Sequence, residues 1–362
     1  MYVAVFLYLI VGWARIKKTV LTANTPHTKV SVLIAARNEE AGIHLTIDDI
    51  LAQDYPKELT EFIIVDDHST DRTSEIISSY ADQGVKLMQL REDKPLNSYK
   101  KKAIAMAIDH SDCELIVATD ADCRMGTKWL STIVNVYEKE HYVMISSPVC
   151  YFEEQSFFER MQTLEFSYLI GMGAAFIGNR NASNCNGANL AYQKETFYAV
   201  GGFRGIDDLA SGDDELLLQK IAVQYPGKIG FLKNENAIVY THAKPNINEF
   251  IQQRRRWASK SVKYKNKAVV ALALGIWFFN WSLLINALMG FVNVYFFKLF
   301  LVQFAIKLFL EFIYGLPIFS FFKRRGLAAL IIFSSPLHTL YLIYIGLIGN
   351  NRTYVWKDRV VK

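Results

Sequence analysis

A C-terminal stretch of apolar residues limits the possible folds of this chain most strongly. From Ala268 to Phe322 the sequence is almost continuously apolar, and few charged residues interrupt it: Lys298, Lys307 and Glu311. A helix needs about 20 apolar residues to cross a bilayer, so this stretch predicts two membrane spans, at 268–291 and 296–319. The segment 327–348, which contains Pro336, is a third candidate. The helical core of a soluble domain would not need runs of this length.

The N-terminus is apolar as well. Met1 to Trp13 carries no charged residue, and basic residues follow it at Arg15, Lys17 and Lys18. The run is short for a span and shows no obvious signal-peptide cleavage site. Basic residues flank membrane segments on the cytoplasmic side. We therefore expect residues 1–18 to form an N-terminal membrane anchor whose basic end lies in the cytoplasm.

Basic clusters also orient the C-terminal segments. Those at 260–267 and 323–325 are both expected in the cytoplasm, which agrees with two spans between them. A third complete span would place the basic tail, 350–362, on the opposite side, whereas a re-entrant or interfacial last helix would keep it inside. The sequence leaves these alternatives open. We expect a multi-pass protein of the cell (inner) membrane with a cytoplasmic domain.

Residues 25–245 have the composition of a soluble α/β domain. Apolar runs that favour strands alternate with helical patterns, and the strands are expected at 30–36, 61–65, 85–90 and 115–118. This alternation predicts a mostly parallel sheet with right-handed crossovers. Polar clusters follow three of these strands, at 37–40, 66–71 and 120–122. Because ligands bind outside the carboxyl ends of such strands, the clusters point to one crevice.

Asp120 and Asp122 stand where a strand buried on both faces, Leu115 to Ala118, should end. Alternation along an extended chain lets both carboxylates point the same way. The two charges would repel each other without a cation between them. Mg²⁺ or Mn²⁺, which prefer oxygen ligands, are the natural choices. A solvated turn that merely ends the strand is the alternative.

Charge and cysteine usage exclude other classes of protein. Basic membrane flanks explain the net charge of +5, and no nucleic-acid partner is expected. The cysteines show neither metal-type spacing nor a secretory framework, which indicates reduced thiols. These residues are Cys113, Cys123, Cys150 and Cys185.

A series of short motifs follows one another along residues 30–260. They are Val32-Leu33-Ile34-Ala35-Ala36-Arg37-Asn38-Glu39, Val65-Asp66-Asp67-His68-Ser69-Thr70-Asp71, Lys100-x-x-Ala103, Asp120-Ala121-Asp122, Gly187-Ala188-Asn189-Leu190-Ala191, Gly212-Asp213-Asp214 and Gln253-x-x-Arg256-Trp257. In this order they resemble the motifs of membrane-bound family 2 glycosyltransferases with a GT-A fold. The resemblance implies an α/β, Rossmann-like catalytic domain at 25–245, an amphipathic interface helix at 246–266, C-terminal transmembrane helices at 267–349 and a basic tail at 350–362.

The resemblance also implies roles for single residues in binding the donor. The nucleotide would be bound by Ala35, Arg37, Glu39, Asp66 and Asp67, and the diphosphate by Lys100, Asp120 and Arg256. Asp120 and Asp122 would hold the metal ion. His242 is a candidate third ligand, with an ordinary exposed or hydrogen-bonded histidine as the alternative. The family commonly has Gly at the position before Lys100, where this chain has Tyr99.

Asp214 matches the general base of the family, which takes a proton from the acceptor hydroxyl. Asp213 would support it, and two close carboxylates tend to raise one pKa, which suits a base. Taken alone, this acidic group is also a good N-terminal helix cap. The acceptor would contact Asn189, Gln253 and Trp257. Their neighbours Arg254 and Arg255 are assigned to a helix surface that lies on the cytoplasmic leaflet.

The implied function is inverting, metal-dependent transfer of a sugar from a nucleotide-sugar, expected to be UDP-linked. The acceptor would be a hydroxyl of a lipid-linked or growing glycan at the membrane. Transfer to polyprenyl phosphate is an alternative, although that branch usually lacks Gln-x-x-Arg-Trp. A non-catalytic membrane subunit that binds nucleotide-sugars is an alternative of a different class. The scarcity of intramembrane charges argues against a transporter.

Overall fold

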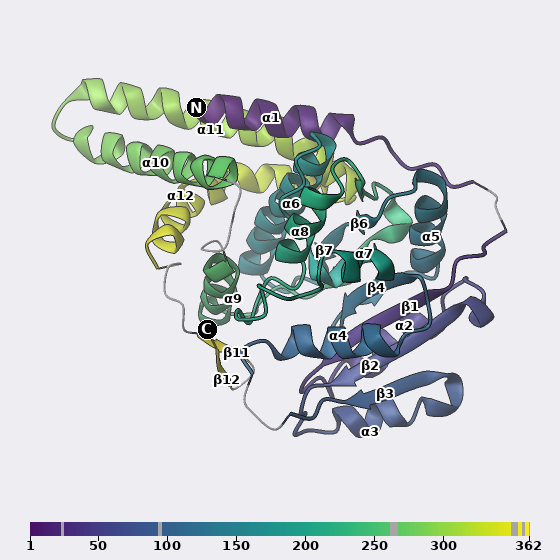
Figure 1. Ribbon diagram of the computed structural model, residues 1–362. Coiled ribbons are helices and arrows are strands. Elements are labelled where there is room, and N and C mark those ends of the chain that lie inside the picture. Colours follow the sequence, from purple (N-terminus) through teal and green to yellow (C-terminus); the bar gives the residue numbers. More distant parts are fainter. Residues whose placement is uncertain (23–24, 93–95, 261–266, 349–353, 357–358, 362) are drawn as a thin grey trace.

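The computed structural model describes residues 1–22, 25–92, 96–260, 267–348, 354–356 and 359–361. It consists of an α/β domain and a helical arm that extends from one side of this domain (Figure 1). The arm comprises the N-terminal helix, 2–15, and the C-terminal helices, 267–348. Parts of the predicted basic clusters lie outside the described residues, namely 261–266 and the tail residues Arg352, Lys357 and Lys362.

Among the described residues, the central sheet has seven strands in the order β3-β2-β1-β4-β8-β6-β9. Their bounds are β1 Val30–Ala36, β2 Thr60–Asp66, β3 Val85–Gln89, β4 Leu115–Asp120, β6 Met144–Ser146, β8 Leu190–Gln193 and β9 Ile229–Phe231. The first four strands run parallel, β8 is antiparallel to both of its neighbours, and β9 is parallel to β6. The predicted mostly parallel, Rossmann-like sheet is confirmed.

Burial explains why apolar runs form the middle of this sheet. Ile63, Ile116 and Val117 are completely buried, as expected for strands covered on both faces. The helices of the domain are α2 Ile43–Leu51, α3 Thr73–Ser78, α4 Tyr99–His110, α5 Trp129–Glu140, α7 Lys194–Ala199 and α8 Glu215–Gln224. A smaller sheet in the order β5-β10-β7 comprises Arg124–Met125, Val239–Thr241 and Val149–Tyr151. Short 3₁₀ helices lie at Lys57–Leu59, Ala81–Gln83, Gly187–Asn189, Glu235–Ala237 and Arg325–Ala329.

The N-terminal helix α1, Tyr2–Arg15, packs against α6, Phe157–Gly178, and α11 of the arm. Glycines bring the backbones of α1 and α6 into contact, because small residues allow close helix crossings. A Cβ on Gly12 would lie 2.2 Å from the carbonyl oxygen of Ala175, and a Cβ on Gly178 would lie 2.1 Å from that of Gly12. The predicted anchor is thus a short apolar helix that is docked onto the rest of the arm.

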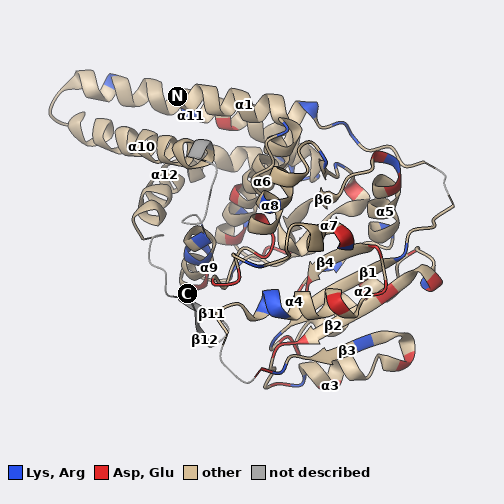
Figure 2. Ribbon diagram, in the orientation of Figure 1, with Lys and Arg blue, Asp and Glu red and all other residues tan. Residues whose placement is uncertain are grey.

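Helices α10 (Lys267–Met289) and α11 (Val294–Phe321) form an antiparallel pair that extends away from the α/β domain (Figure 1). Together with 325–348, they are long and apolar enough to cross a membrane. Figure 2 shows this pair almost without charged residues, whereas Lys, Arg, Asp and Glu concentrate in the α/β domain and in α9, Ile247–Ser259. The three predicted C-terminal candidates are therefore confirmed as apolar helices.

Two of the charges that interrupt the apolar run lie inside the arm. Lys307 and Glu311, one turn apart on α11, form a buried ion pair. Glu311 also accepts hydrogen bonds from the Tyr2 hydroxyl of α1 at 3.3 Å and from Ser335 Oγ at 3.2 Å. Charges within a membrane are costly unless they are paired. This network therefore ties together helices that come from both ends of the chain.

The last long helix, α12 (Leu330–Ile348), packs against α10 and α11 of the arm and also contacts α6 and α9. Just before it, Arg324 Nη2 lies 3.2 Å from Glu154 Oε2. Farther along, the ring of Tyr341 lies 5.4 Å from that of Phe250 in α9. The length and composition of α12 also fit a membrane span. The complete span and the re-entrant or interfacial helix therefore both stay predictions.

Two short strands follow α12 and keep the described part of the tail near the domain. β11 (Tyr354–Trp356) and β12 (Arg359–Val361) pair in antiparallel fashion. β11 contacts α9, and Figure 1 shows β11 and β12 below α9. The described part of the tail therefore lies close to α9.

Candidate active site

A cavity of about 710 Å³ lies between the carboxyl ends of β1 and β4, the segment before α8, and α9. Most of the predicted site residues line it. They are Ala35, Arg37, Glu39, Asp67, Lys100, Asp120, Asp122, Asp213, Asp214, His242, Gln253, Arg256 and Trp257. Asp66 and Asn189 do not. A larger cavity, of about 1150 Å³, contains none of these residues.

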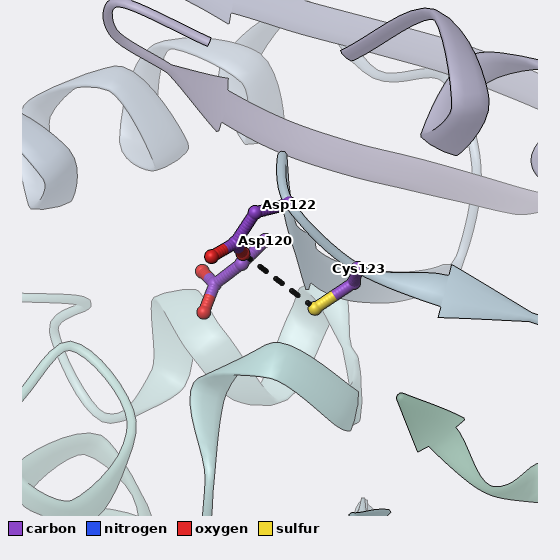
Figure 3. A group of neighbouring side chains, drawn as sticks. All are labelled: Asp120, Asp122 and Cys123. Carbon is purple, nitrogen blue, oxygen red and sulfur yellow. Dashed lines mark hydrogen bonds between the residues drawn. The ribbon is translucent and has the colours of Figure 1, made fainter. Parts of the chain in front are cut away.

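The carboxylates of Asp120 and Asp122 lie close together at the end of β4 (Figure 3). Ligand atoms of Asp120, Asp122 and Cys123 all lie within 4.8 Å of one another. Cys123 is fully buried, and burial, followed by the charges of Asp122 and Asp120, raises the pKa of its thiol well above the usual range. A neutral thiol is a poor ligand for hard cations. The two carboxylates are thus the groups that fit Mg²⁺ or Mn²⁺.

His242 lines the same cavity but does not belong to this close group. His242 is exposed, and its ring lies 4.5 Å from the ring of Phe152. The role of His242 as a third metal ligand, with an ordinary exposed histidine as the alternative, therefore stays a prediction.

Lys100, in the first turn of α4, lies between Asp120 of β4 and Asp213 of the segment before α8. Its Nζ lies 2.6 Å from Asp120 Oδ1 and 3.2 Å from Asp213 Oδ2. Burial alone would lower the pKa of Lys100, but the charges of Asp120 and Asp213 outweigh burial and raise it. The positive charge of Lys100 is therefore stable between Asp120 and Asp213 and offsets part of the negative charge of the cavity.

Asp214 is held by backbone donors and by a lysine. Its Oδ2 accepts a hydrogen bond from the backbone N–H of Gly187 at 3.0 Å, and its Oδ1 accepts one from Glu215 at 2.6 Å. Lys260 Nζ lies 3.6 Å from Oδ1. Burial raises the pKa of Asp214, but Lys260 and the backbone donors outweigh burial and lower it. The expected rise in pKa is therefore wrong for Asp214, whose carboxylate is ionised.

Lys101 is a residue whose role the sequence analysis did not identify. Its side chain is buried. Its Nζ donates hydrogen bonds of 2.6–2.7 Å to three backbone carbonyl oxygens, those of Ile206, Leu209 and Ser211. These carbonyls belong to the loop that leads to Asp213. Successive residues on a helix point about 100° apart, so Lys100 reaches the cavity while Lys101 holds the loop.

If the motifs correctly indicate sugar transfer, Lys101→Met should lower its rate by about 10-fold or more, because the loop before Asp213 would lose three hydrogen bonds. Lys102→Met, which removes the exposed neighbouring lysine, is the matched control and should keep the wild-type rate. The rate of each variant is measured together with its thermal unfolding temperature. Equal rates for Lys101→Met and the wild type would show that the loop does not depend on this lysine.

The same contact predicts a dependence of the rate on pH. Burial lowers the pKa of Lys101 to about 8, even though Asp213 and Asp214 oppose this shift. As the pH rises through this value, the amine loses one donor and the rate should fall. The pKa is lower in the folded than in the unfolded chain, so this titration itself increases the free energy of unfolding as the pH rises. A fall in rate above about pH 8 without loss of thermal stability is therefore the expected result, and Lys101→Met should not show it.

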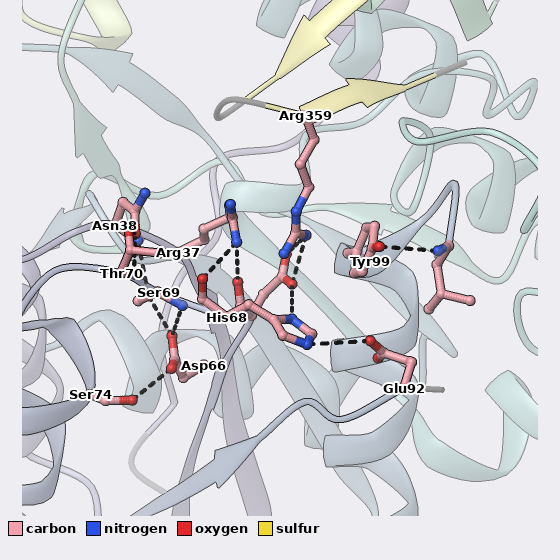
Figure 4. Close-up of polar contacts among 12 residues, drawn as sticks. Arg37, Asn38, Asp66, His68, Ser69, Thr70, Ser74, Glu92, Tyr99 and Arg359 are labelled. Carbon is pink, nitrogen blue, oxygen red and sulfur yellow. Dashed lines mark hydrogen bonds and ion pairs between the residues drawn. The ribbon is translucent and has the colours of Figure 1, made fainter. Parts of the chain in front are cut away.

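The predicted nucleotide-binding turn is built around Arg37 (Figure 4). Arg37 Nη1 donates hydrogen bonds to the carbonyl oxygens of Asp67, at 2.9 Å, and His68, at 2.7 Å. His68 has a φ of 55°, a left-handed conformation that usually favours glycine. Arg37 thus stabilises a strained turn. It also lines the cavity next to Asp67.

Asp66 is used within this turn. Its Oδ2 accepts a hydrogen bond from Ser74 Oγ at 2.6 Å, and its Oδ1 accepts one from the backbone N–H of Ser69 at 3.2 Å. The residue is only 6% exposed. The predicted contact of Asp66 with the nucleotide is therefore wrong, because its carboxylate shapes the turn that presents Asp67.

Asn189 is also a structural residue. It is completely buried, and its Nδ2 donates hydrogen bonds to the carbonyl oxygens of Pro148 and Ala237, each at 2.8 Å. Its Oδ1 accepts a hydrogen bond from Trp129 Nε1 at 3.0 Å. The predicted contact with an acceptor is wrong, since the whole amide is engaged inside the domain.

Helix α9 places Gln253, Arg256 and Trp257 on the cavity. Arg254 is 3% exposed, and its Nη2 lies 2.6 Å from Glu165 Oε2 of α6. Its guanidinium also lies 4.2 Å from the centroid of the Trp257 ring. The assignment of Arg254 to the leaflet surface is therefore wrong. This arginine fastens α9 to α6 and supports Trp257.

The chain is similar to known glycosyltransferases. Residues 31–201 match the family model described as Glycosyl transferase family 2. The chain is 32% identical over 111 residues to a beta-monoglucosyldiacylglycerol synthase of Nostoc sp., a match that covers 31% of this chain and 24% of that protein. It is 26% identical over 188 residues to a 4,4'-diaponeurosporenoate glycosyltransferase of Staphylococcus aureus, covering 51% and 48%. The matched segments span less than half of these relatives' own lengths.

A solved structure shows the same fold over nearly the whole chain. The mannosyltransferase PcManGT from Pyrobaculum calidifontis, in complex with GDP-Man and Mn²⁺, has a TM-score of 0.58 and 20% identity. The match covers 96% of this chain and 92% of that one. It confirms the expected GT-A fold. Residues 31–201, which include β1 to β4 and β8, are thus the part of the chain that resembles glycosyl transferase family 2.

Proposed function

We propose that the protein transfers a sugar from a nucleotide-sugar to a hydroxyl group of a lipid or lipid-linked glycan, with inversion and with a divalent metal ion. One observation carries this proposal. Asp120 and Asp122, Asp214, and the Arg256-Trp257 pair come from distant parts of the chain and line one cavity. In this cavity, Asp120 and Asp122 would hold a metal ion, Asp214 would act as the base, and Arg256 would bind the phosphates.

The diphosphate of the donor would lie between Lys100, Arg256 and the two aspartates of β4. The two side-chain cations would offset its charge. When bound by Asp120 and Asp122, Mg²⁺ or Mn²⁺ would supply Lewis-acid neutralisation of the departing nucleoside diphosphate. The residues present fit such an ion, because the carboxylates of Asp120 and Asp122 lie close together and offer oxygen ligands. We expect the nucleotide of the donor to be UDP, and GDP is the alternative.

Asp214 would take the proton of the acceptor hydroxyl while that oxygen attacks the anomeric carbon. The bond from this carbon to the diphosphate breaks on the opposite side, which inverts the configuration. The lowered pKa of Asp214 means that its carboxylate is ready to accept a proton at neutral pH. Asp213, paired with Lys100, would keep this lysine in place beside the diphosphate.

The acceptor end of the cavity has an apolar wall that belongs to the helical arm. Helix α10 contributes Val269, Leu272 and Ile276, and α6 contributes Leu169 and Met172. Such a wall suits an acceptor whose hydroxyl reaches Asp214 while its apolar part stays in the bilayer. The names of two relatives, which refer to glucosyldiacylglycerol and diaponeurosporenoate, support a lipid acceptor. The α/β domain would then lie at the cytoplasmic face of the cell membrane.

The test is release of nucleoside diphosphate by the purified full chain. A panel of UDP- and GDP-sugars is assayed with Mg²⁺ or Mn²⁺, with and without diacylglycerol in mixed micelles. Release that depends on a hydroxyl acceptor supports the proposal. Donor binding without any release would identify a non-catalytic subunit instead. Release that requires polyprenyl phosphate and survives Asp214→Asn would favour that alternative, because a phosphate acceptor is already ionised and needs no base.

A further inference from the structure

The C-terminal hairpin of β11 and β12 reaches the nucleotide end of the cavity (Figure 4). Arg359 Nη1 lies 2.8 Å from Asp67 Oδ1 and 2.9 Å from Asp67 Oδ2. The guanidinium also lies 3.8 Å from the centroid of the Tyr99 ring. The side chains of Arg359 and Asp67 are only 17% and 3% exposed. This contact is therefore shielded from water, unlike exposed ion pairs, which contribute little.

Both partners of Arg359 belong to the region where the donor nucleotide should bind. Asp67 lines the cavity, and Tyr99 immediately precedes Lys100, which marks the diphosphate end. A nucleobase is a flat ring with N–H donors on its edge, so it could donate to Asp67 and stack on Tyr99. A guanidinium is also flat, carries N–H donors in its plane and stacks on aromatic rings. Arg359 thus makes the two contacts that a nucleobase would make.

The surroundings leave little room for both groups at once. His68 Nδ1 lies 3.1 Å from Asp67 Oδ1, so this carboxylate already has a second partner beside Arg359. The ring of His68 also packs edge-on near Tyr99, at 6.0 Å between centroids. Two flat groups cannot cover the same face of Tyr99. A base that binds here must therefore displace the guanidinium.

We propose that Arg359 holds the nucleobase position when the donor is absent, so that the C-terminal hairpin is a self-inhibitory cap on the donor site. This inference rests on the proposed function, because it takes Asp67 as part of the nucleotide site. The apparent dissociation constant of the donor is then its intrinsic value divided by the fraction of molecules whose cap is displaced. Removing the guanidinium should make donor binding tighter.

The test is titration calorimetry of the purified full chain with UDP and with GDP, in the presence of Mn²⁺. In Arg359→Ala the dissociation constant should fall by about 3- to 10-fold, and the KM for the donor should fall by the same factor while kcat stays unchanged. Arg325→Ala is the matched control, since Arg325 is exposed and bonds to Ser320 Oγ in the arm. This control should bind as the wild type does. Unchanged or weaker binding by Arg359→Ala would overturn the inference.

Hydrogen exchange of the peptides that cover β11 and β12 provides a second readout in the wild-type protein. Displacement predicts faster amide exchange when nucleotide saturates the site. Slower exchange would show that the hairpin closes over the bound nucleotide, and would reject competition. If neither nucleotide binds either protein and no donor is turned over, the proposed function fails and this inference fails with it. If nucleotide binds equally to both proteins and transfer proceeds, only the inference about the hairpin fails.

Discussion

Asparagine in place of Asp214 is expected to reduce sugar transfer by a factor of about 10² to 10⁴, while donor binding stays near the wild-type value. The amide cannot take up the proton of the acceptor. It keeps the size of the side chain and an oxygen for the backbone N–H of Gly187 or Glu215. Lys260 retains Glu215 as a charge partner, 2.5 Å away, so the segment should keep its fold.

The measurement is nucleoside diphosphate release at saturating donor, together with the dissociation constant for the nucleotide. Asp109→Asn is a matched control, because this aspartate lies outside the cavity and accepts a hydrogen bond from the Tyr198 hydroxyl at 2.6 Å. The control should keep full activity. If Asp214→Asn retains more than about a tenth of the wild-type rate, the base lies elsewhere.

Asp122→Ala is expected to lower the transfer rate by at least about 10²-fold, since the metal ion contributes several kcal/mol to neutralising the leaving group. Asp120 would remain as a single carboxylate, already paired with Lys100. The Mn²⁺ concentration needed for half-maximal activity should rise accordingly. In the wild type, EDTA should abolish transfer, and added Mg²⁺ or Mn²⁺ should restore it.

Binding of Mn²⁺ measured by electron paramagnetic resonance gives a readout independent of activity. Cys123→Ala is the control, because it removes the third group of the cluster but keeps both carboxylates. It should bind Mn²⁺ as the wild type does. Undiminished Mn²⁺ binding by Asp122→Ala, or full wild-type activity in EDTA, would exclude this metal site.

The sheet and the apolar helices were predictable because their signals are local. β1 and β4 are continuous apolar runs that end at polar residues, and apolar length alone identifies α10 and α11. The approach of Asp67 to Asp120 followed from topology, since the carboxyl ends of parallel strands meet at one edge of a sheet. The resemblance to a family supplied the remaining expectations, including that for Asp214.

Burial and long-range pairing leave no comparable signal in the sequence. Asp66 and Asp67 are neighbours of the same type, yet one shapes a turn and the other lines the cavity. Lys100 and Lys101 are also neighbours of the same type. Lys100 lines the cavity, whereas Lys101, one residue farther along the helix, holds the loop before Asp213. The charge of Lys260 reverses the expected shift in the pKa of Asp214. No motif marks Lys260, because its effect depends on its distance from Asp214 in the folded chain.

The apolar wall that α10 gives the cavity has a consequence for the path of the product. Val269, Leu272 and Ile276 line the cavity, and the helix continues outward from the α/β domain (Figure 1). With a lipid acceptor, the apolar part of the glycosylated lipid would leave the cavity along this helix without entering water.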